Sequence, residues 1–342
     1  MGVTIKDIAK VAGVSHTTVS RALNGNPVIP PKTAAMIRNI AGDLGYLPSA
    51  AARGLKTRRS GVLGVLVSRI DNPYFGEIIQ GIEDAIRNSG YSIFIASSSL
   101  DPQKEKEIVQ AFSEHRVDGV IIGSVPVERS NLNLLNQYGI PAVVINNQSA
   151  RSQKYSISHD DEYGARQVTR HLLDLGHRRI AYLGNACAPR INDNRLQGLK
   201  AECESSGFTV AENWITHQPG GEIENGAAGM TALLGAGVPF SAVFCFNDLM
   251  AVGALSVLRQ NGLRVPEDIS IAGFDNIPYS AYTTPALTTF DQPKRSIGDE
   301  AASMLLELIS SNASSQSRRK PLNKMMRGEL LVRKSTAQFA KE

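Results

Sequence analysis

The chain has 342 residues, of which 42% are hydrophobic and 20% are charged, and its formal net charge is +4. This length exceeds one comfortable hydrophobic core, so we expect two or three folding units of ordinary globular composition. No apolar run is long enough to span a bilayer, and the amino terminus lacks a charged-then-apolar signal peptide. Both observations predict a cytoplasmic protein without a membrane partner.

Motifs of cofactor and metal chemistry are missing from the sequence. The three cysteines, Cys187, Cys203 and Cys245, are far apart and have no CxxC or Cys/His spacing. We therefore expect buried thiols rather than a disulfide or a zinc site. There is also no GxGxxG, P-loop or GxSxG sequence, so we predict that the chain has no cofactor and is not an enzyme.

The first residues predict a short helix with a defined start. Thr4 can cap it, and Asp7 lies three positions later, as in a capping box. Ile8, Val11 and Ala12 are expected to form its apolar face.

A second helix follows a tight turn at Gly13, and Ser15 is placed to cap it. His16, Thr17 and Arg21 are predicted to face outward from this helix. Arg21 can form two hydrogen bonds to a guanine edge, and Thr17 offers a hydroxyl and a methyl group. This helix-turn-helix pattern is typical of a unit that enters a DNA major groove, although ordinary helical hairpins share it.

The distribution of charge favours the DNA interpretation. Residues 1–59 contain nine Lys or Arg against two acids, whereas the rest of the chain contains 27 basic and 30 acidic residues. A small basic segment joined to a slightly acidic body is typical of a nucleic-acid-binding protein.

A third helix is predicted to begin at Pro31 and to end before Gly45, which completes a small all-α head over residues 1–47. Residues 48–60 are predicted to be a hinge helix and linker. The exposed Leu55 lies there between basic residues, which suggests a wedge for the DNA minor groove. A flexible linker whose Leu55 contacts the next domain is the alternative.

The body of the chain, residues 61–342, alternates apolar strands with helices, which predicts doubly wound α/β lobes. We expect strands over residues 62–67, 92–96, 119–122, 142–145, 180–183, 242–246 and 269–273, and helices over 75–88, 103–115, 163–175 and 249–261. This alternation is too long for one modest sheet and predicts two lobes, roughly 61–160 and 161–290.

Polar residues follow several of these strands, where ligands of such sheets bind. Asn146, Asn247 and Asp275 each follow a predicted strand, and Tyr74 and Phe75 open the helix after the first strand. Carboxylate, amide and aromatic groups in one cleft can hold vicinal hydroxyls or the edge of a purine. The alternative is that Asn and Asp only cap the following helices.

Motifs along nearly the whole chain resemble those of the lactose-repressor/galactose-repressor family of bacterial transcription regulators. They lie at residues 4–24, 44–48, 52–56, 72–75, 117–119, 175–181, 247–248, 273–276, 328–330 and 333–336. Two departures are visible: no aromatic residue lies at 220–224, where members often have one, and no apolar heptad tail follows the core. Trp214 lies earlier and is predicted to belong to a strand.

The resemblance implies a periplasmic-binding-protein-like core whose chain crosses between the lobes near residues 160, 290 and 320. The first lobe would then contain residues 61–160 and 291–320, and the second 161–290 and 321–342. It also implies two sets of site residues. The DNA-binding set is Thr4, Ser15, His16, Thr17, Thr18, Arg21, Asn24, Ser49, Ala52, Arg53, Leu55 and Lys56. The effector-binding set is Tyr74, Phe75, Asn146, Arg195, Asn247, Asp275 and Gln292.

The function implied is that of a homodimeric repressor of a catabolic operon. It would bind a palindromic operator in double-stranded DNA, with an affinity that a small effector, a sugar or sugar derivative, controls from the cleft. The alternative is a sugar-binding or sugar-modifying protein on the same two-lobe core, without a regulatory role.

Overall fold

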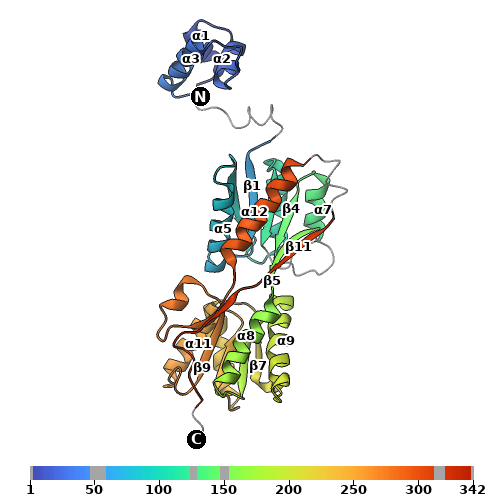
Figure 1. Cartoon of the computed structure of the whole chain (residues 1–342), viewed down its shortest axis with the longest axis vertical. Helices are drawn as coiled ribbons and strands as arrows, with labels where there is room; N and C mark the ends of the chain where they lie inside the picture. Colours follow the sequence, from blue (N-terminus) through green and yellow to red (C-terminus); the bar gives the residue numbers. More distant parts are fainter. Residues whose placement is uncertain (1–2, 47–58, 124–128, 147–153, 312–319, 340–342) are drawn as a thin grey trace. The chain divides into compact units, whose positions relative to one another are not determined.

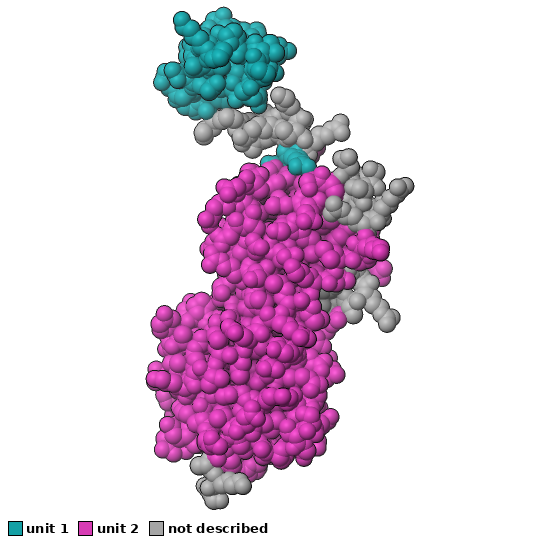
Figure 2. All heavy atoms as spheres, viewed as in Figure 1, with its two compact units in different colours: residues 1–60 teal, residues 61–342 magenta. Residues whose placement is uncertain are grey.

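The computed structural model describes residues 3–46, 59–123, 129–146, 154–311 and 320–339. The chain divides into two compact units, residues 1–60 and residues 61–342 (Figure 2). The predicted hinge residues Ser49, Ala52, Arg53, Leu55 and Lys56 lie outside the described residues. None of the described helices is both long and apolar enough to cross a membrane.

The described residues of the first unit form three helices: α1 (Ile5–Ala12), α2 (His16–Leu23) and α3 (Pro31–Asp43) (Figure 1). The Asp7 carboxylate accepts hydrogen bonds from the backbone and the hydroxyl of Thr4 at 2.8 and 2.7 Å, which starts α1. Gly13 ends α1 with φ +65°, and Ser15 Oγ accepts from the backbone N–H of Thr18 at 3.1 Å to start α2.

The predicted apolar face of α1 is wrong at Val11, whose side chain is 61% exposed. The helix packs through Ile5, Ile8, Ala9 and Ala12 instead. These positions are spaced i, i+3, i+4 and i+7, so they form one stripe and leave Val11 beside it.

The second unit contains two six-stranded sheets, one in each lobe (Figure 1). The first sheet has the order β11-β5-β4-β3-β1-β2 and is parallel throughout. Its strands are β1 (Val62–Val67), β2 (Ser92–Ser97), β3 (Gly119–Gly123), β4 (Ala142–Ile145), β5 (Tyr155–His159) and β11 (Leu322–Met326). Helices α5 (Pro73–Ile86) and α12 (Lys294–Ser310) cover one face, and α6 (Pro102–Glu114) and α7 (Arg129–Gln137) cover the other.

The second sheet repeats this order as β12-β10-β9-β8-β6-β7, with only β12 antiparallel. Its strands are β6 (Ile180–Asn185), β7 (Ile215–Gln218), β8 (Ala242–Cys245), β9 (Ser270–Asp275), β10 (Thr288–Asp291) and β12 (Glu329–Leu331). Helices α8 (Asp161–Asp174) and α9 (Pro189–Ser205) pack on one face, and α10 (Ile223–Gly235) and α11 (Asp248–Gln260) pack on the other. Short 3-10 turns cover Glu212–Trp214 and Pro278–Ala281. The prediction that Trp214 belongs to a strand is therefore wrong, because this residue ends a 3-10 turn directly before β7.

The chain passes between the lobes after β5, after β10 and after β11. The third crossing was predicted near residue 320, with 321–342 in the second lobe, and this is wrong. Strand β11 pairs with β5 in the first sheet, so the crossing falls at Arg327 and Gly328. This strand, Leu-Asn-Lys-Met-Met, is an exposed edge strand without apolar alternation, so its sequence did not predict a strand.

Candidate functional site

The seven residues predicted to bind an effector line one cavity between the two lobes. Tyr74, Phe75 and Asn146 come from the first lobe, Arg195, Asn247 and Asp275 come from the second, and Gln292 lies on the second crossing. The cavity has a volume of about 110 Å³. A water molecule needs roughly 10–15 Å³ on this measure, so the space accommodates a small ligand.

The topology of the two sheets places this cavity. In each sheet the strand order reverses beside the first strand, between β1 and β3 and between β6 and β8. Ser68 follows β1, Gly123 ends β3, Asn185 ends β6 and Phe246 follows β8, and all four line the cavity. This is the crevice at the carboxyl ends of the strands where open α/β sheets bind ligands.

A chain of hydrogen bonds crosses the cavity from one lobe to the other. Asn146 Nδ2 donates to the Tyr74 hydroxyl at 2.7 Å, and that hydroxyl donates to Gln292 Oε1 at 3.3 Å. Gln292 Nε2 then donates to Asp275 Oδ1 at 2.5 Å. Within the described residues, Asn146 Oδ1 is buried and has no hydrogen-bond partner, so it is an acceptor at the cavity wall that a ligand could satisfy.

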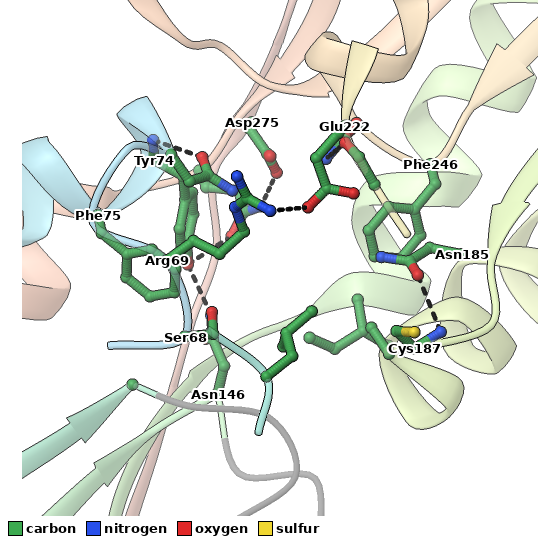
Figure 3. Close-up of a pocket in the computed structure, with 18 of the residues that line it drawn as sticks. Ser68, Arg69, Tyr74, Phe75, Asn146, Asn185, Cys187, Glu222, Phe246 and Asp275 are labelled. Atoms are coloured by element: carbon green, nitrogen blue, oxygen red, sulfur yellow. Dashed lines mark hydrogen bonds and ion pairs between the residues drawn. The ribbon is translucent and has the colours of Figure 1, made fainter. Parts of the chain in front are cut away.

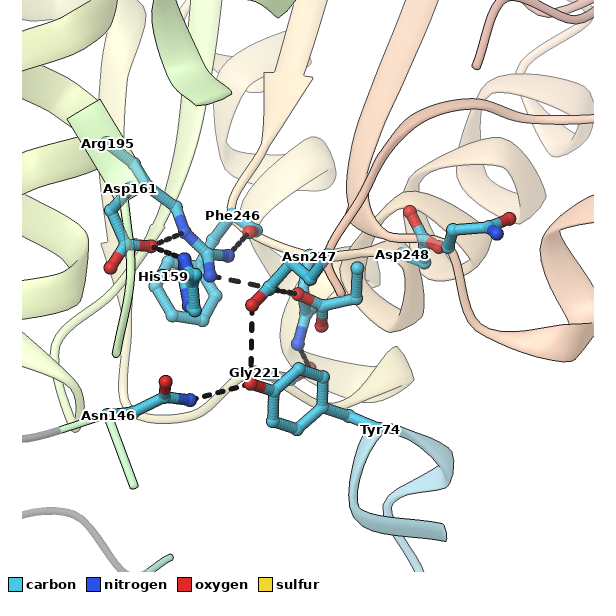
Figure 4. A network of polar contacts seen from close by, with 12 residues as sticks. Tyr74, Asn146, His159, Asp161, Arg195, Gly221, Phe246, Asn247 and Asp248 are labelled. Atoms are coloured by element: carbon cyan, nitrogen blue, oxygen red, sulfur yellow. Dashed lines mark hydrogen bonds and ion pairs between the residues drawn. The ribbon is translucent and has the colours of Figure 1, made fainter. Parts of the chain in front are cut away.

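Arg195 is the centre of a buried ionic network in the second lobe (Figure 4). Its Nε donates to Asp161 Oδ1 at 2.8 Å, and its guanidinium also donates to the backbone carbonyl of Phe246. Asp275 Oδ1 lies 3.7 Å from the guanidinium. The guanidinium carbon lies 4.5 Å from the centre of the Phe246 ring and 3.9 Å from that of Phe274. These contacts fix the orientation of Arg195 at the cavity.

Asp275 has a positive φ angle, and the pKa of its carboxyl group is raised. Its φ of +114° is rare for a residue with a side chain and costs on the order of 1–3 kcal/mol, which is typical of strain held at functional sites. Burial raises its pKa to about 7, and the neighbouring Arg195 only partly offsets this. The carboxyl group can therefore accept or donate a hydrogen bond near neutral pH.

Asn247 shows that capping and lining the cavity are compatible. Its Oδ1 accepts from the backbone N–H of Met250 at 2.9 Å, which caps α11, and its Nδ2 donates to the Gly221 carbonyl at 2.9 Å. The residue still lines the cavity. Both interpretations made from the sequence therefore hold for its position in the structure, and its contact with a ligand remains a prediction.

Apart from Thr4, which caps α1, the described residues of the predicted DNA-binding set lie at the two ends of α2 and along its side. His16, Thr17 and Arg21 are exposed, whereas Thr18 is half-buried against the cap at Ser15. Asn24 ends the helix, and its Nδ2 donates to the carbonyl of Ser20 at 2.5 Å. The second helix therefore presents polar and basic side chains that can reach base edges.

Each of the two units of the chain matches a known protein family. Residues 4–49 match the family model "Bacterial regulatory proteins, lacI family", and residues 169–336 match a periplasmic binding protein-like domain. The transcriptional repressor PurR of Proteus mirabilis (strain HI4320) is 38% identical over 308 residues, which cover 90% of this chain and 90% of that protein. The chain belongs to the LacI family.

Two solved structures extend this similarity over the full length. The Lac repressor dimer bound to operator and the anti-inducer ONPF has a TM-score of 0.85 at 27% identity, and the match covers 98% of this chain and 100% of that one. A complex of the transcriptional regulator CelR with cellobiose has a TM-score of 0.74 at 27% identity and covers 97% and 99%. This LacI-family chain is therefore a DNA-binding transcriptional repressor and not an enzyme, with the predicted two-lobe core.

Several residues that line the cavity of this LacI-family member were not predicted from the sequence to bind an effector. They are Ser68, Arg69, Asn72, Leu100, Gly123, Asn185, Cys187, Ala188, Ile191, Gly221, Glu222 and Phe246. Most of them lie in loops, where neither periodicity nor a cap marks a ligand contact. Phe246 carried a signal, because it ends a predicted strand directly before Asn247, and Asn72 carried another, because it begins the motif at residues 72–75.

The prediction that all three thiols are buried is wrong for Cys187. Cys203 and Cys245 are buried, but Cys187 is exposed at the cavity, where its Sγ donates to the carbonyl of Pro219 at 3.2 Å (Figure 3). The loop between β6 and α9 holds it there, outside both hydrophobic cores. No group of His, Cys, Asp or Glu residues that could hold a metal ion is found in the described ranges.

Proposed function

We propose that this protein is a homodimeric repressor whose affinity for a palindromic operator changes when a small ligand binds between its lobes. The head would comprise residues 1–47, the hinge 48–60, and the core 61–342. The protein would act in the cytoplasm on the operon whose DNA it binds.

The observation that carries the proposal is the hydrogen-bond chain from Asn146 through Tyr74 and Gln292 to Asp275. It joins the first lobe, a crossing segment and the second lobe at the cavity. A ligand that replaces or extends these bonds would interact differently with the open and closed arrangements of the lobes. Such a difference in affinity is what allosteric control requires.

A carbohydrate is the effector class that we propose. Amide, carboxyl and hydroxyl groups around the cavity match the alternating donors and acceptors of sugar hydroxyls, and Phe75 and Phe246 offer apolar ring faces. The cellobiose complex of CelR supports this class by similarity of fold. A purine base could use the same donors, so it belongs in the test.

The homodimer is supported by exposed apolar side chains on both lobes. Phe94 and Ile95 are exposed on the edge strand β2 of the first lobe. Tyr279 and Tyr282 are exposed at the 3-10 turn of the second lobe, and Tyr282 is 86% exposed. A two-fold contact with a second copy of the chain would cover these side chains and the exposed sheet edge.

The test is a screen of thermal unfolding with uncharged sugars, purine bases and nucleosides, followed by gel-shift assays of the hits on genomic DNA fragments. A true effector should raise the melting temperature and change the fraction of DNA bound at fixed protein concentration. The variant Asp275→Asn should lose both effects. A compound that stabilises the protein equally in this variant binds elsewhere and would count against the proposal.

A further inference from the structure

The cavity contains two cations, and carboxylates already neutralise both. The first is Arg69, whose guanidinium donates to Asp71 at 3.0 and 2.6 Å and lies 3.5 Å from Glu222 Oε1 (Figure 3). The hydrogen bond from Arg69 to Asp71 is the main reason that the pKa of Arg69 is raised, and the nearby charges of Glu222 and Glu224 add to it.

The second cation is Arg195, which is buried between Asp161 and Asp275. Lys294 lies behind this pair, and it is also engaged. Its Nζ donates to Asp291 Oδ1 at 3.0 Å and to the Asp275 carbonyl at 2.5 Å. Among the described residues of the cavity wall, no guanidinium is therefore left uncompensated for an incoming anion.

Helix starts are the other common source of positive potential, since each carries roughly half a positive charge. Asn72 caps α5 and Asn247 caps α11, so amides of both helices are already paired. The carboxylate of Glu222 is itself the cap of α10. Helix α9 begins at the cavity wall without a side-chain cap, at Ala188, so its first amides can donate to a hydroxyl or carbonyl oxygen of a ligand. Helix α12, which follows Gln292, also begins without a side-chain cap.

We infer that the cavity selects an uncharged polar ligand over its phosphorylated or carboxylated form, and that Glu222 is a specificity-determining residue because it neutralises Arg69 from the opposite lobe. This inference rests on the proposed function, in which the cavity binds the effector. A phosphate in the cavity would have to break an ion pair of Arg69 or Arg195, and it would meet the remaining carboxylates at close range. An unphosphorylated sugar or a neutral base can bind without breaking an ion pair and is not repelled by the carboxylates.

The charge of the cavity can be measured before its ligand is known, because Cys187 lies on its wall. We would alkylate the native protein with neutral iodoacetamide and with anionic iodoacetate, and follow Cys187 by peptide mass spectrometry. The ratio of the two rates cancels the thiolate fraction and reports the local potential. The buried Cys203 and Cys245 should react slowly, and burial raises the pKa of Cys203 to about 11.

The ratio of the iodoacetate rate to the iodoacetamide rate should be about threefold lower at Cys187 than in an uncharged cysteine peptide. The scale is that two like unit charges roughly 7 Å apart in water repel each other by about the thermal energy. Glu222→Gln should raise this ratio, and it should also improve binding of ribose 5-phosphate or glucose 6-phosphate relative to the parent sugar. Glu212→Gln, which removes an exposed carboxylate outside the cavity wall, is the matched control and should leave the ratio unchanged.

A wild-type ratio equal to or above that of the peptide would overturn the inference, since the cavity would then attract anions. An unchanged ratio in Glu222→Gln, with the fold verified by circular dichroism, would remove Glu222 from this role. Neither result bears on whether a ligand controls operator binding. Conversely, a failure of every ligand to affect the operator would refute the proposed function and leave the measured charge of the cavity intact.

Discussion

The Tyr74 hydroxyl donates a hydrogen bond to Gln292 Oε1 at 3.3 Å, across 218 positions of the sequence. Tyr74 lies in the first turn of α5 in the first lobe, whereas Gln292 lies on the second crossing and bonds onward to Asp275. Both side chains are buried. Movement of the lobes about the crossings would therefore change the hydrogen bonding of the cavity wall, as the proposed control by a ligand requires.

Tyr74→Phe removes only the hydroxyl group that links Asn146 to Gln292. It leaves Asn146 Nδ2 and Gln292 Oε1 without their partner, so the free energy of unfolding should fall by about 1–3 kcal/mol. The response of operator binding to the effector should weaken with it. Chemical denaturation measures the first effect. Tyr138→Phe, at a residue that is 63% exposed, is the control and should change stability by less than about 0.5 kcal/mol. Equal stabilities of the two variants would mean that the hydrogen bonds from Asn146 through Tyr74 to Gln292 do not form in solution.

Asp275→Asn should change how stability depends on pH. The folded protein raises the pKa of Asp275 from 3.8 to about 7, mainly through burial, so folding favours the protonated carboxyl. This contribution is fully present below pH 3.8 and is lost as the pH rises toward 7, with a slope of no more than about 1.4 kcal/mol per pH unit.

The variant should therefore gain stability relative to the wild type between pH 5 and pH 7. Denaturation curves at intervals of half a pH unit test this. His159, whose pKa burial lowers to about 4, is common to both proteins and cancels in the difference. Asp248, whose pKa burial raises to about 6, interacts with Asp275, so the variant should also titrate Asp248 at a lower pH. Parallel profiles for the two proteins would show that Asp275 titrates normally.

Gly81→Ala should damage the packing of α5 on α12. A Cβ at Gly81 would lie 2.0 Å from the backbone carbonyl oxygen of Arg295, a contact that only a shift of the helices can relieve. We expect a loss of about 1–3 kcal/mol in the free energy of unfolding. Gly76→Ala, in the same helix with no atom within 4 Å of its Cβ, should be neutral or stabilising by up to about 1 kcal/mol. Similar losses in both variants would contradict the close approach of the helices.

Arg21→Ala tests the direct readout of DNA by α2. Arg21 is exposed on the same side as Thr17, so its loss should cost about 1–3 kcal/mol on the operator and little on unrelated DNA. Lys32→Ala, in the first turn of α3, should weaken binding to all sequences alike if it contacts phosphate. Fluorescence anisotropy at one fixed salt concentration separates the two patterns. An operator affinity that is unchanged in Arg21→Ala would remove Arg21 from the site.

The hinge prediction concerns residues 49–56, which lie outside the described part of the chain. Gly54 opposes helix formation by roughly 1 kcal/mol, so we expect this segment to become helical only on a palindromic operator, where Leu55 would wedge into the minor groove. Leu55→Ala should then lose most of the specific affinity. Amide hydrogen exchange with and without operator measures the ordering, and equal protection in both states would leave the hinge as a plain linker.

Strands buried on both faces were predictable because their sequences are apolar without interruption. Residues 62–67 and 142–145 were predicted with the bounds that the structure gives. Strands β5 and β10 were missed because they carry Ser, Thr and His, whose polar groups are buried beside the crossings. Strand β11 was missed because an exposed edge has no apolar pattern to detect, and this also misplaced the third crossing.

The cavity was predictable to the extent that its residues follow strands. Asn146, Asn247 and Asp275 could be proposed because parallel strands end at one edge of a sheet. Arg69 and Glu222 could not, since their pairing depends on how two loops from different lobes face each other. No spacing in the sequence encodes that distance.

The most direct test of the central claim is the operator dissociation constant of the wild type and of Asp275→Asn, titrated with the uncharged sugars and purine bases that stabilise the wild type against heat. We expect that at least one compound changes the wild-type constant by about 5- to 150-fold, the usual range of allosteric coupling. We also expect that Asp275→Asn binds the operator with near wild-type affinity but no longer responds to the compound. A wild type whose operator affinity no such compound changes, or a variant that keeps the full response, would contradict control from this cavity.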